Sequence, residues 1–120
     1  MKYLKYLDAL HYQNPNKILS IIFTSNSCPN CSNFVNEIVK KIEQSYNEDI
    51  EFIAVDCDDE TIKFPPARLP TSYFYVPKSD VKIITREGVA PSLDVMKNDI
   101  SKMIEIKNTG KSFNEVFFSS

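Results

Sequence analysis

Two of the chain's three cysteines, Cys28 and Cys31, are separated by only two residues. If they begin a helix, their sulfurs come within bonding distance, so the pair can exist as a dithiol or as a disulfide. A helix N-terminus carries unpaired N–H groups and a partial positive charge, which favour a thiolate. Pro29 suits the first helical turn, where no N–H partner is lost. The spacing therefore predicts a redox pair in which Cys28 attacks and Cys31, one turn deeper, resolves.

Two other interpretations of the cysteine pair are open. It could be half of a zinc site, but structural zinc usually has four nitrogen or sulfur ligands, and only His11 and Cys57 remain, both distant in sequence. It could also be a chance pair of inert thiols. Cys57 lies in an acidic run that we interpret as a solvated loop, and we interpret its thiol as structural. We favour the redox interpretation and expect no metal and no bound cofactor.

The composition is typical of one globular domain. The chain has 120 residues, of which 42% are hydrophobic and 25% charged, and its formal net charge is −2. This charge provides no basic surface for nucleic acid, and no apolar run approaches the roughly 18 residues of a membrane span. The first residues lack the apolar centre of a signal peptide, and an odd number of cysteines does not suit a secreted disulfide framework. We expect a cytoplasmic protein and a monomer.

The elements around the cysteines predict an α/β unit. Residues 18–23 are almost all apolar and mostly β-branched, which is typical of a central strand covered on both faces. The carboxyl end of this strand leads to the cysteines, where open α/β sheets place functional groups. After them, apolar residues at helical spacing predict an amphipathic helix, and residues 50–55 predict a second buried strand. Together these elements form a right-handed βαβ unit.

The rest of the chain predicts a hairpin and helices. Residues 72–76 and 81–85 indicate two antiparallel strands, and a last helix begins near Ser92 and ends before Gly110. At the start, Tyr3, Leu7 and Leu10 recur at helical spacing, which predicts a helix over about residues 2–11. We assign residues 1–110 to one domain and residues 111–120 to a C-terminal tail. The aromatic tail either packs as an extra element or forms an exposed docking strip.

The order of these elements, the motif Cys28-Pro29-Asn30-Cys31 and the sequence Leu69-Pro70-Thr71 before a strand resemble the thioredoxin superfamily over about residues 2–108. The resemblance implies an α/β thioredoxin-like fold, with a four-stranded mixed sheet (βαβ plus ββα) flanked by helices and an extra N-terminal helix. It implies that Pro70 is cis and lies against the cysteine pair, so that the backbone of Leu69 can pair with a substrate strand. It also places Gly88 where backbone approaches the site.

Three features depart from the thioredoxin pattern. Ile22 stands where thioredoxins carry a buried aspartate that assists proton transfer at the second cysteine, and Ser27 replaces their tryptophan. The dipeptide Pro29-Asn30 is nearer the Pro-Tyr of glutaredoxins than the Gly-Pro of thioredoxins. The glutathione-binding marks of glutaredoxins are weak, since no lysine closely precedes Cys28. The resemblance therefore identifies the superfamily and leaves the branch open.

The resemblance implies a thiol–disulfide oxidoreductase that reduces or exchanges protein disulfides through Cys28 and Cys31. Pro29, Leu69, Pro70 and Gly88 would bind the substrate. The implied partners are a disulfide-bearing protein and a reductant, either thioredoxin reductase or glutathione, with no nucleic acid and no membrane. Two alternatives stay open: a glutaredoxin-like, glutathione-dependent oxidoreductase, and a binding module that keeps the fold with little catalysis.

Overall fold

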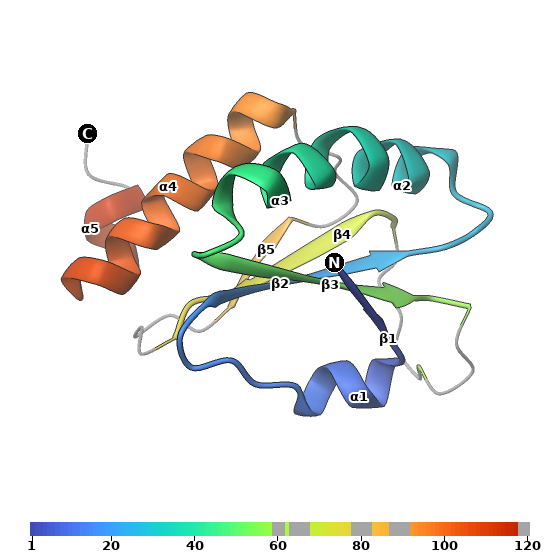
Figure 1. Ribbon diagram of the computed structural model, residues 1–120, viewed down its shortest axis with the longest axis horizontal. Coiled ribbons are helices and arrows are strands. Elements are labelled where there is room, and N and C mark those ends of the chain that lie inside the picture. The colour runs from blue at the N-terminus through green and yellow to red at the C-terminus, as the bar shows by residue number, and fades with distance from the viewer. Residues whose placement is uncertain (59–61, 63–67, 78–82, 87–91, 118–120) are drawn as a thin grey trace.

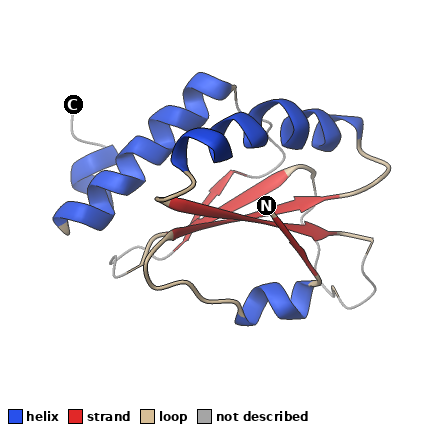
Figure 2. Ribbon diagram, in the orientation of Figure 1, coloured by secondary structure: helices blue, strands red, loops and turns tan. Residues whose placement is uncertain are grey.

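A mixed five-stranded sheet lies between two layers of helices in the computed structural model of the chain (Figures 1 and 2). The structure describes residues 1–58, 62, 68–77, 83–86 and 92–117. The strands are β1 (Lys2–Leu4), β2 (Ile18–Thr24), β3 (Ile50–Asp56), β4 (Thr71–Tyr75) and β5 (Ile83–Arg86). Their order is β1-β3-β2-β4-β5. The first three run parallel to one another, and β4 runs antiparallel to both of its neighbours.

One helix covers one face of this sheet and the other helices lie on the opposite side (Figure 1). Their bounds are α1 (Tyr6–His11), α2 (Pro29–Asn33), the π-helical segment η1 (Phe34–Val39), α3 (Lys40–Tyr46), α4 (Leu93–Thr109) and α5 (Phe113–Phe117). The segments α2, η1 and α3 follow one another without interruption, opposite α1. The short α5 packs beside α4 and buries Val116, so this part of the tail packs as an extra element. The proposed division between residues 110 and 111 stays a prediction.

The alternation of side chains along β2 divides the core into two clusters. Ile18 and Ile22 point toward α3 and α4, whereas Leu19 and Phe23 point toward α1. Ile18 and Ile22 are both 0% exposed, as expected for a strand covered on both faces. The prediction that residues 18–23 form a central strand is therefore confirmed, with β2 extending one residue further to Thr24.

The predicted βαβ unit, hairpin and last helix are also confirmed. β2 and β3 pair in parallel from Ile18 opposite Ile50 to Thr24 opposite Asp56. β4 and β5 pair in antiparallel fashion, and the described part of the second hairpin strand begins at residue 83. The hydroxyl of Ser92 accepts the N–H of Val95 at 3.3 Å and begins α4. Gly110 ends α4 with a φ of 73°, a left-handed conformation that glycine adopts without strain.

The predicted helix over residues 2–11 is wrong in its first part. Residues 2–4 form β1, which pairs in parallel with residues 53–55 of β3, and α1 begins only at Tyr6. Tyr3 and Leu7, which the helical spacing assigned to a buried face, are 73% and 50% exposed. The open edge of β3 offers backbone hydrogen-bond partners that no local periodicity reveals, and this pairing outweighs the helical pattern. The four predicted strands are thus joined by a fifth.

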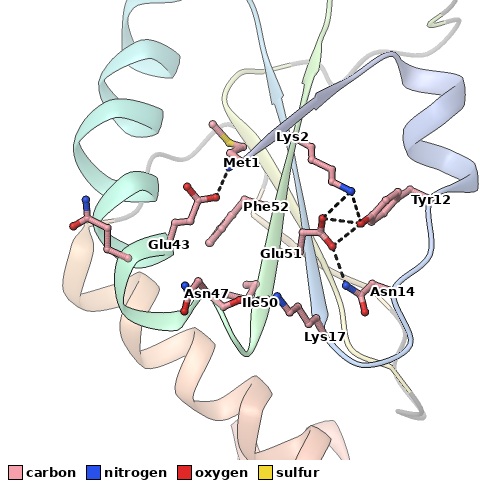
Figure 3. A pocket seen from close by; sticks show the side chains of 11 residues that line it. Met1, Lys2, Tyr12, Asn14, Lys17, Glu43, Asn47, Ile50, Glu51 and Phe52 are labelled. Atoms are coloured by element: carbon pink, nitrogen blue, oxygen red, sulfur yellow. Dashed lines mark hydrogen bonds and ion pairs between the residues drawn. The ribbon is translucent and has the colours of Figure 1, made fainter.

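A polar network fastens β1 and the segment after α1 to the sheet (Figure 3). The carboxylate of Glu51, on β3, accepts hydrogen bonds from the Tyr12 hydroxyl at 2.7 Å and the Asn14 amide at 2.9 Å. The Lys2 ammonium lies 3.4 Å from the same carboxylate. Burial acts to raise the pKa of Glu51, but the hydrogen bonds from Tyr12, Asn14 and Lys2 outweigh it, so the pKa is lowered. The folded state therefore favours the charged carboxylate.

Replacing Glu51 tests this network. We expect Glu51→Gln to lower the free energy of unfolding by about 1 to 2 kcal/mol near neutral pH, because the charged acceptor of three donors is lost. A carboxyl whose folded pKa is lowered stabilises the fold above its unfolded pKa, and this contribution is lost as the pH falls through the folded pKa. The difference between wild type and variant, measured by urea unfolding, should therefore shrink in acid.

The matched control is Glu105→Gln. Glu105 pairs with Lys111 at 3.1 Å, but both side chains are about half exposed, at 44% and 52%. An exposed pair of this kind contributes little, so the control should change the free energy of unfolding by less than about 0.5 kcal/mol. An equal loss in both variants, or a Glu51→Gln difference that does not narrow in acid, would contradict the assignment.

Candidate functional site

Strand β2 leads directly to the cysteine pair at the head of α2. Cys28 is the residue that precedes the helix, with an extended backbone at φ −107° and ψ 102°. Its sulfur accepts a hydrogen bond from the Cys31 N–H at 3.3 Å. Pro29 occupies the first helical turn, as predicted, and is exposed. The Cys28 sulfur thus accepts one of the N–H groups that a helix start leaves without a partner inside the helix.

Cys31 lies one turn deeper than Cys28, and its burial makes the two thiols chemically different. It is 1% exposed, whereas Cys28 is half-buried. Burial raises the pKa of Cys31 to about 12, and the neighbouring thiols of Cys28 and Cys57 raise it as well. A backbone hydrogen bond from Ser25 acts in the opposite direction. The arrangement has the asymmetry that an accessible attacking thiol and a protected resolving thiol require.

Cys57 lies near this pair, although it is distant in sequence. Its N–H donates to the carbonyl of Thr24 at 2.7 Å, which continues the pairing of β2 and β3 by one residue. The hydroxyl of Ser25 donates to the Asp58 carboxylate at 3.2 Å and ties the two loops together. Burial, followed by the charges of Asp56 and Asp58, raises the pKa of Cys57 to about 11. All three thiols are free, and Cys57 is half-buried.

The peptide bond between Leu69 and Pro70 is located at the same edge of the sheet. It is cis, as the resemblance implied. In the register of β2 and β4, Phe23 faces Thr71, so one further step brings Thr24 opposite Pro70. Leu69 is half-buried and packs on the cluster that also contacts Cys57. The fold thus brings the end of β2, which leads to the cysteines, beside residues 69 and 70.

The remaining residues that the sequence analysis singled out are Gly88, Ile22 and Ser27. Gly88 lies outside the described residues, so its role stays a prediction. Ile22 is fully buried in the core, and Ser27 is exposed with its hydroxyl 3.0 Å from that of Ser25. Sequence reasoning missed Ser25, which contacts both Cys31 and Asp58. No signal in the sequence indicates this role, because it depends on which loops the strands bring together.

A hollow of about 660 Å³ lies at the opposite end of the sheet, beside the first residues of β2 and β3 (Figure 3). The charged groups on its wall are paired within the protein. The Met1 ammonium lies 2.6 Å from Glu43, and Lys17 donates to the carbonyl of Asn47 at 2.7 Å. The Glu51 network described above completes the wall. We assign no site there, because these contacts already satisfy the groups that could bind a charged ligand.

The described part of the chain contains neither a metal centre nor a membrane-spanning helix. Within these residues, no group of three or more His, Cys, Asp or Glu side chains is arranged to hold a metal ion. No described helix has the length and apolar character needed to cross a bilayer. Among the described residues, the cysteine pair at the head of α2 is therefore the candidate site.

The order of thiol reactivity is testable by alkylation. A thiol whose pKa is about 11 or about 12 is ionised to less than roughly one part in 10⁴ near pH 7. We therefore expect iodoacetamide to modify Cys28 at least about tenfold faster than Cys31 or Cys57, as followed by peptide mass mapping over time. The urea-unfolded chain is the control, since its three cysteines should react at similar rates. Faster modification of Cys57 in the folded protein would contradict the assignment.

Several solved structures with this architecture are thioredoxins. The thioredoxin of Fasciola hepatica has a TM-score of 0.65 and 23% identity, covering 86% of this chain and 99% of that chain. A Thermus thermophilus thioredoxin has a TM-score of 0.64 and 16% identity, covering 92% and 93%. Trichomonas vaginalis thioredoxin has a TM-score of 0.62 and 20% identity, covering 85% and 96%. No family model and no curated protein matches the chain. At these identities the likeness shows the fold, and the implied fold is confirmed.

Proposed function

We propose that this chain, which has the thioredoxin fold, is a thiol–disulfide oxidoreductase that reduces or exchanges protein disulfides through Cys28 and Cys31. The observation that carries the proposal is the placement of the two sulfurs. Cys28 is accessible at the head of α2, and its sulfur accepts the N–H of the buried Cys31 at 3.3 Å. We propose a cytoplasmic location, which the odd number of cysteines supports, and we propose that the protein acts as a monomer.

The proposed reaction has two exchange steps. The thiolate of Cys28 attacks one sulfur of a substrate disulfide, so the substrate S–S bond breaks and its other sulfur leaves as a thiolate that takes a proton from solvent. Cys31 then loses its proton and attacks the Cys28 sulfur. The bond between Cys28 and the substrate breaks, and the second substrate thiol is released. Two electrons have passed to the substrate, and the chain holds a Cys28–Cys31 disulfide.

A second reductant must restore the dithiol after each cycle. We propose thioredoxin reductase or glutathione for this role, as two alternatives that the fold alone does not separate. Turnover assays with each system distinguish them. Activity with glutathione and glutathione reductase, and none with thioredoxin reductase, would identify a glutaredoxin-like enzyme.

We propose that the substrate lies along residues 69 and 70 and over the head of α2. The position of Pro70 beside the end of β2 supports this, since an extended substrate segment could pair with the backbone of Leu69 there. Pro70 has no N–H that would compete for this pairing. Pro29 is exposed next to Cys28 and is available for contact, and Gly88 stays part of the proposal from the resemblance alone.

Cysteine variants test the redox proposal. Insulin-disulfide reduction by dithiothreitol should lose about 100-fold or more of its catalysed rate in Cys28→Ser, because the attacking sulfur is removed. Cys31→Ser should accumulate a stable mixed disulfide, detected by mass spectrometry, because the resolving sulfur is missing. Cys57→Ser is the matched control and should stay within about twofold of wild type. If Cys28→Ser retained full activity, the proposal would be wrong and a binding module would be favoured.

A further inference from the structure

Ser25 is joined to both cysteines of the pair through its main chain. Its carbonyl oxygen accepts the N–H of Cys28 at 3.1 Å, which closes the turn that leads into α2. A backbone hydrogen bond from Ser25 also reaches the sulfur of Cys31. Because this contact lowers the pKa of Cys31, the group that makes it is the N–H of Ser25, since only a donor favours the thiolate. One residue therefore contacts the backbone of Cys28 and the sulfur of Cys31.

The side chain of Ser25 ties this turn to the loop after β3. Its hydroxyl donates to the two carboxylate oxygens of Asp58 at 3.2 and 3.3 Å. An ionised carboxylate carries no hydrogen, so Ser25 uses its only hydroxyl hydrogen in this contact. The same oxygen accepts the N–H of Ser27 at 3.3 Å, and the Ser27 hydroxyl lies 3.0 Å away as a second donor. The donor and both acceptor positions of the Ser25 hydroxyl are thus occupied.

The Asp58 carboxylate is carried by a loop that the structure also holds in place. The Asp58 N–H donates to the Asp56 carboxylate at 2.9 Å, and the Cys57 N–H donates to the carbonyl of Thr24 at 2.7 Å. The loops after β2 and β3 are therefore joined by a main-chain bond and, one residue further on, by the bond between Ser25 and Asp58. A hydrogen bond to a charged acceptor is stronger than one between neutral groups. The main chain of Ser25 is thus fixed relative to the sheet.

We propose that Ser25 is a positioning residue, whose hydroxyl, held by Asp58, keeps its own N–H on the Cys31 sulfur during the second exchange step. The inference rests on the proposed function, because it concerns a step of that reaction. In this step Cys31 gives its proton to solvent, and its sulfur forms a bond to the Cys28 sulfur. The bond between Cys28 and the substrate sulfur breaks, and the departing thiolate takes a proton from solvent. The N–H of Ser25 stabilises the negative charge while it is on Cys31.

The environment of Cys31 explains why such a donor matters. The residue is 1% exposed, so bulk water does not solvate its thiolate freely, and burial raises its pKa to about 12. A hydrogen bond donated to a charged acceptor stabilises the charge more than it stabilises the neutral thiol. Ile22, which stands where thioredoxins carry an aspartate, offers neither a donor nor a proton acceptor. A fixed N–H at the end of β2 therefore increases the fraction of Cys31 that can attack.

Stopped flow with the aromatic disulfide dithiobis(nitrobenzoate) separates the two exchange steps in a Cys57→Ser background. Attack by Cys28 releases one thionitrobenzoate at a rate proportional to the reagent concentration, and attack by Cys31 releases the second at a rate independent of it. We expect Ser25→Ala to slow the second release roughly tenfold near neutral pH, because a hydrogen bond to a charged sulfur is weakened. The first release should stay within about twofold of the parent rate. Ser25→Thr keeps the hydroxyl and should recover most of the second rate.

Two further variants test whether Asp58 acts through Ser25. Asp58→Ala removes the acceptor of the Ser25 hydroxyl and should also slow the second release. The double variant with Ser25→Ala should be no slower than Ser25→Ala alone, because both changes break the same bond. Loss of a negative charge by itself favours a nearby thiolate, so a faster second release in Asp58→Ala would contradict the inference.

Ser32→Ala is the matched control. Ser32 is an exposed serine next to Cys31, and its hydroxyl accepts a hydrogen bond from the Asn36 amide at 3.3 Å. Its replacement should leave both releases within about twofold of the parent rates.

Alkylation distinguishes positioning from a merely loosened loop. If Ser25→Ala opened the loop, Cys31 would be exposed and iodoacetamide would modify it faster. Loss of the N–H from a sulfur that stays buried should instead leave alkylation of Cys31 no faster than in the parent, as followed by peptide mass mapping. A second release within twofold of the parent rate, or faster alkylation of Cys31, would overturn the inference. If the parent itself released only the first thionitrobenzoate, the redox proposal would fail, which is a different result from equal second rates.

Discussion

The site depends on the register of β2, which pairs with β3 on one side and with β4 on the other. Parallel pairing brings Thr24 level with Asp56, and the antiparallel pairing brings Phe23 level with Thr71. These two alignments place three chain segments at one edge of the sheet: the cysteine loop, residues 56–58 and residues 69–70. A slip of one residue in either pairing would turn every side chain of that strand to the opposite face. The two buried clusters on either side of β2 oppose such a slip. It would move Ile18 and Ile22 out of one cluster and Leu19 and Phe23 out of the other, so that neither cluster would keep its packing.

The different properties of the two site thiols follow from depth in the fold, because the residue type is the same. Cys28 ends the loop at the head of the helix, where free N–H groups and partial exposure meet. One helical turn carries Cys31 inward to an almost fully buried position, where loss of solvent makes its thiolate costly. The same burial limits the access of other oxidants and thiols to the Cys31 sulfur. Placing two identical groups at the start of one amphipathic helix is therefore enough to make one accessible and the other protected.

Sequence reasoning could predict the parts of this structure that local patterns specify. Three predictions of this kind were confirmed, and each has a local physical cause. The apolar run of residues 18–23 forms β2, the pair at positions 28 and 31 lies at the start of α2, and Ser92 caps α4. It failed at Lys2–Leu4, because the strand there exists only through the free edge of β3, and the spacing of Tyr3 and Leu7 also fits a helix. The nearness of Cys57 to Cys31 was equally hidden, since it arises from strand pairing across more than 25 residues of sequence. The cis bond at Pro70 was implied by the resemblance, and Pro70 was singled out because it alone of the prolines there directly precedes the strand.

The fold also keeps the groups that affect its stability in acid apart from the cysteine pair. The Glu51 network lies at the amino ends of β2 and β3, and the cysteines lie beyond their carboxyl ends (Figures 1 and 3). The Glu51 carboxyl, whose pKa is lowered, loses its stabilising effect only as the pH falls below its ordinary range. Cys31 and Cys57, whose pKa values are raised, affect the free energy of unfolding only at alkaline pH. The folded state holds their protons above the pH at which the unfolded chain releases them, so stability declines as the pH rises beyond the ordinary thiol value of 9.0. Between the acid range of Glu51 and the alkaline range of the two thiols, titration of these three groups does not change the free energy of unfolding. Titration of Glu51, Cys31 and Cys57 therefore leaves the free energy of unfolding unchanged near neutral pH, where the proposed disulfide exchange would be measured.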